Sequence, residues 1–160
     1  MRSSGVRLEE ITDDNREAVR ALRVRRDQKR FVASVSRSLK DAAKTAEANP
    51  WYRAVYCGDE PAGFVMLSWK PPTGPFTGRY FLWRLLVDKR YQGRGIGRDA
   101  LTQIADLVRA DGGTELLTSY ETGEGEPLPF YRKFGFEPTG EIYDGEIVLR
   151  LTLSKDAGDG

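Results

Sequence analysis

Hydrophobic side chains recur along this chain at spacings that change from one segment to the next. Residues 6–11 alternate weakly between apolar and polar positions, which predicts a short first strand. Thr12 or Asp13 then caps a helix that runs to about residue 22, where apolar side chains recur at helical spacing. The same spacing predicts a second helix over residues 28–48, ending before Asn49-Pro50.

The next apolar segments are typical of paired strands. Residues 51–57 and 62–69 flank the turn-forming sequence Gly58-Asp59-Glu60-Pro61 and predict a hairpin. Residues 70–78 contain three prolines and two glycines, which predicts a loop. Residues 80–87 are apolar on both faces, as expected of a central strand that is covered on both sides.

The last part of the chain returns to alternating helices and strands. Residues 96–108 have an amphipathic pattern that predicts a helix, terminated by Asp111-Gly112-Gly113. Further along we expect a strand at 115–120, a short helix at 129–134 and a final strand pair at 142–153. The predicted order is β-α-α-β-β-β-α-β-α-β-β, an α/β (α+β) fold with one mixed sheet and helices on its faces. A chain of 160 residues suits a single domain over 1–160, with its core at about 5–153.

Charge and composition exclude several classes of function. Lys and Arg number 25 against 24 Asp and Glu, whereas a nucleic-acid binder usually has a large basic excess, so we expect no nucleic-acid partner. Histidine is absent, which removes Ser-His and Cys-His catalysis and nearly all zinc chemistry, so we expect no metal. The one cysteine, Cys57, permits no intrachain disulfide. No apolar run approaches the ~20 residues of a membrane span, so we expect a cytoplasmic protein with no membrane partner.

A glycine-rich segment at residues 92–98 lies between the apolar strand and the amphipathic helix. Its residues are Gln92, Gly93, Arg94, Gly95, Ile96, Gly97 and Arg98. A helix N-terminus carries partial positive charge and unpaired N–H groups, so it attracts phosphate, and glycines let an anion approach the backbone. Two arginines add positive charge at the same place. The spacing fits neither a Walker A loop nor a dinucleotide fingerprint, because Arg98 stands where either pattern needs another residue. A glycine-rich turn without a ligand remains the alternative.

Two separated motifs resemble those of the GNAT N-acetyltransferase superfamily. Gln-x-x-Gly-x-Gly between a strand and a helix resembles its acyl-CoA signature, and the segment from Phe130 to Pro138 resembles its second motif, Tyr-x-x-x-Gly-Phe. The resemblance covers about residues 5–153 and implies a mostly antiparallel central sheet with helices on both faces. The run at 80–92 further resembles a bacterial subgroup of polyamine (spermine/spermidine) acetyltransferases.

The resemblance implies acetyl-CoA as the acetyl donor co-substrate. Backbone amides of residues 92–97, with Arg98 beside them, are then expected to hold the CoA diphosphate. Backbone groups at the end of the preceding strand, those of Leu85, Leu86 and Val87, are expected to hold the pantetheine arm and the thioester carbonyl. An extended amide chain can pair with a strand edge, and an N–H aimed at the thioester oxygen would stabilise an oxyanion.

The resemblance also assigns Tyr131 as the general acid that protonates the departing CoA thiolate. The alternative is that Tyr131 only packs beside Phe130 and Phe134, because aromatic side chains at helical spacing usually belong to a core. Many relatives have a CoA-contacting asparagine about seven residues before this tyrosine, where this chain has Glu124.

The acceptor is expected to be a primary amine, such as a polyamine or another small cationic amine. Amine attack requires the neutral form, so without histidine a carboxylate acting through water is the expected base. Glu121, Glu124 and Glu126 precede Tyr131 and are the candidates to attract a cation, with a solvated loop as the alternative. Phe76 and the pair Trp51-Tyr52 are further candidates to line an acceptor pocket.

Two functions from different classes remain after these arguments. The first is direct acetyl transfer from acetyl-CoA to an amine, and the second is a non-catalytic acyl-CoA-binding or sensing module. A homodimer is the default expectation for assembly, because it is the commonest soluble oligomer. If Arg84 of the apolar strand is buried, it needs a carboxylate or backbone partner.

Overall fold

The computed structural model describes residues 5–153 and has the element order that the sequence predicts. Its strands are β1 (Val6–Glu9), β2 (Pro50–Cys57), β3 (Glu60–Trp69), β4 (Tyr80–Val87), β5 (Glu115–Tyr120), β6 (Glu137–Tyr143) and β7 (Glu146–Thr152). Its helices are α1 (Arg16–Arg20), α2 (Val35–Lys44), α3 (Ile96–Ala110) and α4 (Leu128–Phe134), with short 3-10 turns η1 (Arg26–Gln28), η2 (Ala46–Ala48) and η3 (Lys89–Tyr91).

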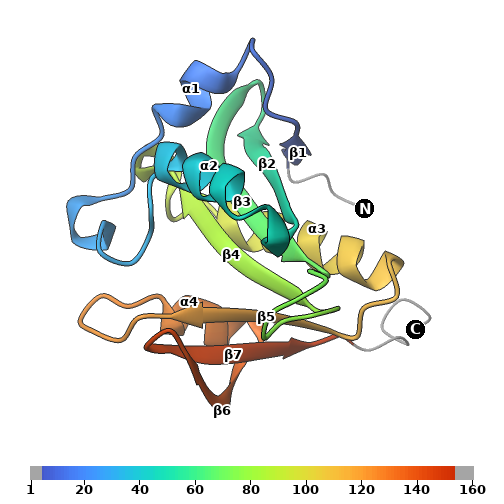
Figure 1. The fold of residues 1–160 in the computed structure, drawn as a ribbon. Helices are drawn as coiled ribbons and strands as arrows, with labels where there is room; N and C mark the ends of the chain where they lie inside the picture. Colours follow the sequence, from blue (N-terminus) through green and yellow to red (C-terminus); the bar gives the residue numbers. More distant parts are fainter. Residues whose placement is uncertain (1–4, 154–160) are drawn as a thin grey trace.

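The strands form one seven-stranded sheet in the order β1-β2-β3-β4-β5-β7-β6 (Figure 1). Every neighbouring pair is antiparallel except β4 and β5, which are parallel. This confirms the mixed, mostly antiparallel sheet with helices that the sequence predicts.

The two parallel strands separate soon after they meet. Their paired residues are only Phe81 with Leu117 and Leu82 with Thr118. Beyond that point β4 stays paired with β3 and β5 with β7, so the sheet opens between its two central strands (Figure 1). A register shift in the β3–β4 pairing falls at Trp83, which has no partner in β3, and such a bulge bends the strand that carries it.

Apolar side chains pack on both faces of the sheet. The cluster on one face includes the buried stripe of α3 and reaches Tyr131 of α4, and the opposite face is covered by α1 and α2. The α3 stripe is the one that the amphipathic pattern predicts, namely Ile96, Ala100, Leu101, Ile104, Ala105 and Val108. Burial on both faces explains why residues 80–87 are almost continuously apolar.

The predicted helix over residues 28–48 is shorter in the structure. Helix α2 begins only at Val35, because Ser34 is its N-cap and the Ser34 side chain accepts a hydrogen bond from the Arg37 amide at 3.1 Å. Val32 packs against the apolar cluster from an irregular segment, so this apolar residue is explained by burial and does not indicate a helix. Residues 29–34 therefore form a connection that lies close to the cleft described below.

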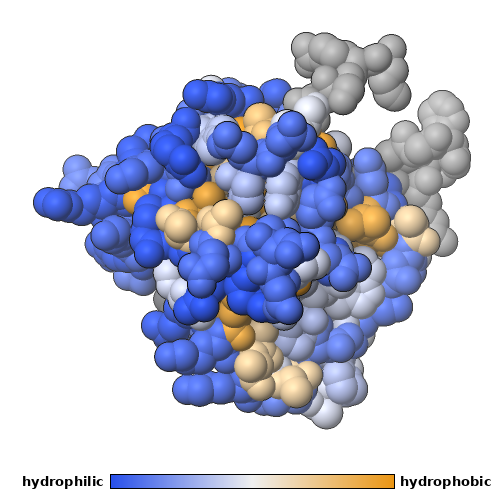
Figure 2. Space-filling view, turned by 90° about the horizontal axis from the view of Figure 1, so that it is seen from above, coloured by the Kyte–Doolittle hydropathy of each residue, from blue (hydrophilic) through white to orange (hydrophobic). Residues whose placement is uncertain are grey.

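The surface is hydrophilic over most of the face seen from above, where hydrophobic residues form small separate patches (Figure 2). This agrees with a composition in which 31% of residues are charged. Within residues 5–153, no helix has the length and apolar character needed to cross a membrane.

Candidate active site

The glycine-rich turn joins β4 to the first turn of α3. Gly93 has φ 82° and Gly95 has φ 80°, a backbone conformation in which residues other than glycine are strained. Gly95 is the N-cap of α3, a helix of 15 residues, so the helix begins where the turn ends. The unpaired N–H groups of that helix end and the exposed side chains of Arg94 and Arg98 make the turn suitable for an anion.

Close packing holds the same helix end against its neighbours. A Cβ added at Gly97 would lie 3.4 Å from both Phe130 Cζ and Val87 Cγ2. The first turn of α3 therefore lies directly against β4 and α4, and a larger residue there would need one of these neighbours to move.

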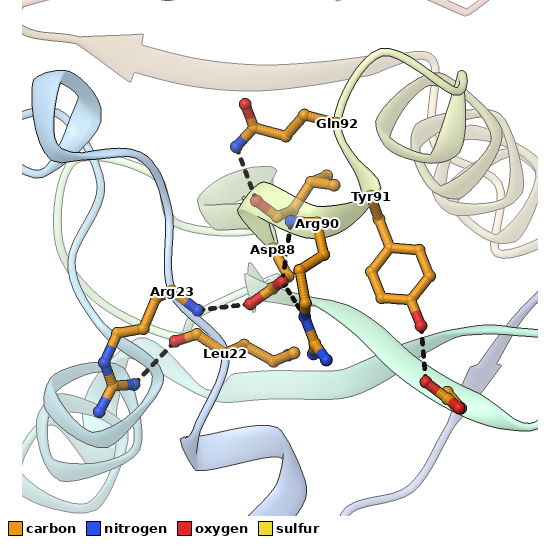
Figure 3. A network of polar contacts seen from close by, with 8 residues as sticks. Leu22, Arg23, Asp88, Arg90, Tyr91 and Gln92 are labelled. Atoms are coloured by element: carbon orange, nitrogen blue, oxygen red, sulfur yellow. Dashed lines mark hydrogen bonds and ion pairs between the residues drawn. The ribbon is translucent and has the colours of Figure 1, made fainter.

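Asp88, at the end of β4, fixes the backbone that leads into the turn (Figure 3). Its side chain is buried and accepts hydrogen bonds from the Arg23 amide at 2.7 Å, the Arg90 amide at 3.0 Å and Arg90 Nε at 2.7 Å. Burial alone would raise the pKa of Asp88, but these hydrogen bonds outweigh it and hold the pKa below its usual value. The charged carboxylate thus ties the segment after α1 to the start of the turn.

Gln92 links the turn to the segment before α2. Its side-chain amide donates to the Val87 carbonyl at 2.9 Å, as Figure 3 shows, and to Gln28 Oε1 at 2.8 Å. Gln28 Nε2 donates back to Gln92 Oε1 at 3.2 Å. The Gln92 side chain therefore holds the turn against the end of β4 and against Gln28.

A cleft with a volume of about 1770 Å³ runs along the turn and continues between the parted strands. The predicted donor-site residues line it with one exception: Leu85, Val87, Gln92, Gly93, Arg94, Gly95, Ile96, Gly97 and Arg98. The exception is Leu86, whose side chain is buried in the core under α1 and α2. Side chains from both faces of the sheet line the cleft, so the cleft reaches the gap between β4 and β5 on both faces.

Tyr131 lies on α4 with only 8% of its surface exposed. Its ring packs against Phe130 and Phe136, each at 5.3 Å between ring centroids. Burial raises the pKa of Tyr131 to about 12, while a hydrogen bond with the Thr118 side chain opposes this rise and the charge of Glu146 adds to it. Because Thr118 is one of the last paired residues of β5, the phenol reaches the point where β4 and β5 part.

The three glutamates before Tyr131 have different surroundings. Glu121 lines the cleft and accepts from Arg30 Nη2 at 2.9 Å, and Glu126 also lines it and accepts from the Gly123 amide at 2.8 Å. Glu124 is exposed and does not line the cleft. Glu121 and Glu126 thus already have hydrogen-bond partners in the protein, and the role of the three glutamates toward a substrate stays a prediction.

The wall opposite α4 contains aromatic residues. Phe76 of the 70–78 loop stacks on Phe81 at 4.4 Å between centroids, and Tyr143 packs edge-on against Phe76 at 4.9 Å. All three line the cleft, as predicted for Phe76, whereas Trp51 and Tyr52 do not.

Charged residues on the same wall were not predicted as site residues. Arg84 donates to Asp41 of α2 at 2.7 Å, which confirms that this strand arginine needs a carboxylate partner. Asp144 and Glu146 come from the β6–β7 turn and also line the cleft. Only the pairing of β7 with β5 brings them there, so no local sequence pattern could have identified them.

Comparison with known proteins places this arrangement in a family. Residues 8–136 match the model of the acetyltransferase (GNAT) family. The chain belongs to the GNAT family of acetyltransferases. This GNAT acetyltransferase is 28% identical over 151 residues to a spermine/spermidine N(1)-acetyltransferase of Bacillus subtilis, covering 90% of this chain and 96% of the relative. It is 32% identical over 111 residues to the N-alpha-acetyltransferase RimI of Mycobacterium tuberculosis, covering 68% and 67% of the two chains.

Solved structures agree with the GNAT fold. A GNAT family acetyltransferase from Elizabethkingia anophelis, with acetyl-CoA bound, superimposes with a TM-score of 0.62 at 16% identity and covers 94% of this chain and 100% of its own. Among residues 5–153, this GNAT acetyltransferase has no group of three or more Asp, Glu and Cys side chains placed to hold a metal ion.

Proposed function

We propose that the protein transfers the acetyl group of acetyl-CoA directly to a primary amine of a small cation, in particular a polyamine of the spermidine or spermine type, with Tyr131 as the general acid. The observation that carries this proposal is one continuous cleft that joins the glycine-rich helix start, the parted strands and the Tyr131 ring. The helix start suits a diphosphate and the parted strands suit an extended amide chain. The phenol of Tyr131 can donate to a leaving group.

Acetyl-CoA would bind along the α3 side of the cleft. Backbone amides of residues 92–97 would hold its diphosphate at the N-terminus of α3, and Arg94 and Arg98 would contribute charge. Within residues 5–153 neither arginine has an ion-pair partner, which leaves both charges available to the phosphates. Beyond Leu82, β4 is no longer paired with β5. This unpaired edge of β4 would hold the pantetheine arm at Leu85 and Val87.

Tyr131 would act by hydrogen bonding to the departing sulfur. Its pKa of about 12 keeps the phenol protonated throughout the working pH range. The phenol would therefore donate a hydrogen bond to the sulfur as the C–S bond breaks and pass its proton to the departing thiolate, which is the role of a general acid.

The acceptor wall supports a cationic amine. Its aromatic side chains, Phe76, Phe81 and Tyr143, can contact an aliphatic stem and a cation, and its carboxylates can pair with ammonium groups. The relative in Bacillus subtilis named for spermine and spermidine supports a polyamine among such amines.

The deciding experiment follows free thiol release from acetyl-CoA in the presence of polyamines, aminoglycosides, amino acids and peptide amines. We expect turnover, with spermidine or spermine preferred to neutral or acidic amines. Acetyl-CoA binding measured by calorimetry without turnover on any member of the panel would instead support a non-catalytic acyl-CoA-binding or sensing module.

A further inference from the structure

Glu146 lies at a defined position on the acceptor side of the cleft. It is the first residue of β7 and pairs with Tyr143 across a two-residue turn, in which Asp144 has φ 51° and Gly145 has φ 80°. Such a turn fixes the register of the hairpin, so the start of β7 is set by backbone geometry. Ser119 Oγ of β5 donates to Glu146 Oε1 at 2.7 Å, which holds one carboxylate oxygen in place.

The neighbouring residue on β5 faces the other side of the sheet. Successive strand side chains point to opposite faces, so Thr118 and Ser119 are directed to opposite sides at the point where β4 and β5 part. Thr118 contacts Tyr131, whereas Ser119 contacts Glu146. A phenol and a carboxylate therefore approach the same opening in the sheet from opposite faces.

The charges around Glu146 leave it open to a cation. Arg84 of β4 is near enough for the two charges to interact, but the guanidinium of Arg84 is already paired with Asp41 of α2 at 2.7 Å. The other titratable groups near Glu146 are Tyr143 and Asp144 of the same hairpin, which also line the cleft, and Tyr131 of α4, which reaches the opening from the other face. Within residues 5–153 no Lys or Arg forms an ion pair with Glu146.

We propose that Glu146, oriented by Ser119, binds the reacting ammonium group and accepts its proton. This inference rests on the proposed function and names the carboxylate that the acceptor meets. The ammonium N–H bond breaks as its proton passes to Glu146, directly or through one water. The freed nitrogen lone pair forms the C–N bond with the acetyl carbonyl carbon, the C–S bond breaks, and the sulfur leaves as a thiolate that takes the phenol proton of Tyr131. The nitrogen then loses its second proton to solvent, which leaves the neutral amide. Glu146 returns its proton to solvent and Tyr131 regains one, so the balance is ammonium and acetyl-CoA to amide, CoA and one proton.

The test compares Glu146→Gln with Glu141→Gln, a matched change at an exposed glutamate of β6 that does not line the cleft. Two measurements are made on each full-length variant. The first is kcat/KM for spermidine from pH 6.5 to 9.5, together with KM for acetyl-CoA. The second is calorimetric binding of spermidine to the complex of enzyme with CoA, which needs no turnover.

We expect Glu146→Gln to lower kcat/KM for spermidine about 10²-fold at pH 7, within the range of a general base. The loss should shrink toward pH 9.5 as more free amine becomes available, since an alkylammonium has a pKa near ~10.4. The KM for acetyl-CoA should stay unchanged, spermidine should bind at least tenfold more weakly, and Glu141→Gln should match the wild type. Ser119→Ala should lower kcat/KM by about tenfold or less, because it removes one hydrogen bond to a charged group.

Two results would overturn the inference. One is wild-type spermidine binding and turnover in folded Glu146→Gln, and the other is a loss that is the same at every pH and extends to acetyl-CoA, as a structural role predicts. If the wild type binds spermidine but acetylates no amine, the proposed function fails, and the binding comparison still decides whether Glu146 holds the amine.

Discussion

Replacing Tyr131 by phenylalanine is the most direct perturbation of the proposed chemistry. The change removes one oxygen and keeps the ring, so the contacts with Phe130 and Phe136 remain. Thr118 loses its phenol partner but keeps its own hydrogen bond to the Leu82 carbonyl at 2.9 Å. We therefore expect a stability loss of about 1 kcal/mol, or a Tm within about 2–4 °C of the wild type.

The kinetic loss follows from the role of the phenol as a donor. A hydrogen bond to a charged group contributes ~1.5–3 kcal/mol, which corresponds to about 10–150-fold in rate. This reaches only the lower end of the ~10²–10⁴-fold range for general acids, because a thiolate departs fairly well without a proton. The loss should appear in kcat, and acetyl-CoA affinity should hardly change, because the turn and the strand edge supply that binding.

Single-turnover measurements of thiol release between pH 7 and 9.5 provide the assay, since they isolate the chemical step. The ratio of wild-type to variant rate should stay constant over this range, because the pKa of Tyr131 is about 12 and its phenol remains protonated. Wild-type single-turnover rates in the variant would refute the general-acid role and leave Tyr131 as a packing residue. A ratio that falls steeply toward pH 9.5 would refute the high pKa.

Three further predictions address the turn, the acceptor wall and alkaline stability. Gly95→Val should abolish measurable acetyl-CoA binding by calorimetry, because Gly95 has φ 80° and an added Cβ would lie 3.3 Å from Arg98 Nη2. Arg94→Ala should lower the affinity less, and a folded Gly95→Val variant with wild-type affinity would contradict the phosphate site. Asp41→Asn should free Arg84 to pair with Glu146 and so lower kcat/KM for spermidine by roughly tenfold at unchanged KM for acetyl-CoA; an equal loss for both substrates would point to unfolding. Because the pKa of Tyr131 in the folded protein exceeds its value in the unfolded chain, its contribution to stability is complete below pH ~10 and disappears as the pH rises through about 12. Chemical denaturation should therefore show a smaller decline of the free energy of unfolding at high pH in Tyr131→Phe than in the wild type.

Local patterns predict the elements of this fold best where the pattern is long. Residues 80–87 and 96–108 coincide with β4 and α3 nearly to the residue, because two-sided burial and a 15-residue amphipathic stripe leave few alternatives. The helix predicted over residues 28–48 was wrong before residue 35. Val32 is apolar because it packs against the core cluster from an irregular segment, and Ser34 caps the helix that follows. The spacing of a few apolar residues does not distinguish a buried irregular segment from a helix.

The site was predictable only in the part that is contiguous in sequence. The glycine-rich turn and Tyr131 belong to short motifs, and they line one cleft. The Trp83 bulge, the early end of the β4–β5 pairing and the contact of Ser119 with Glu146 all depend on strand register, which links residues 15 to 36 positions apart. The predicted cytoplasmic location and homodimer stay predictions.

The separation of β4 and β5 also bears on the route of the acetyl group. An acyl-enzyme route needs a strong nucleophile in the cleft, and the chain has no histidine to activate one. Its one cysteine, Cys57, lies on β2 and outside the cleft. In the proposed function, the same opening would admit a thioester from the α4 side and an amine from the α2 side, so both reactants would meet without an intermediate carrier. Direct transfer is therefore the route that the arrangement of the two faces favours.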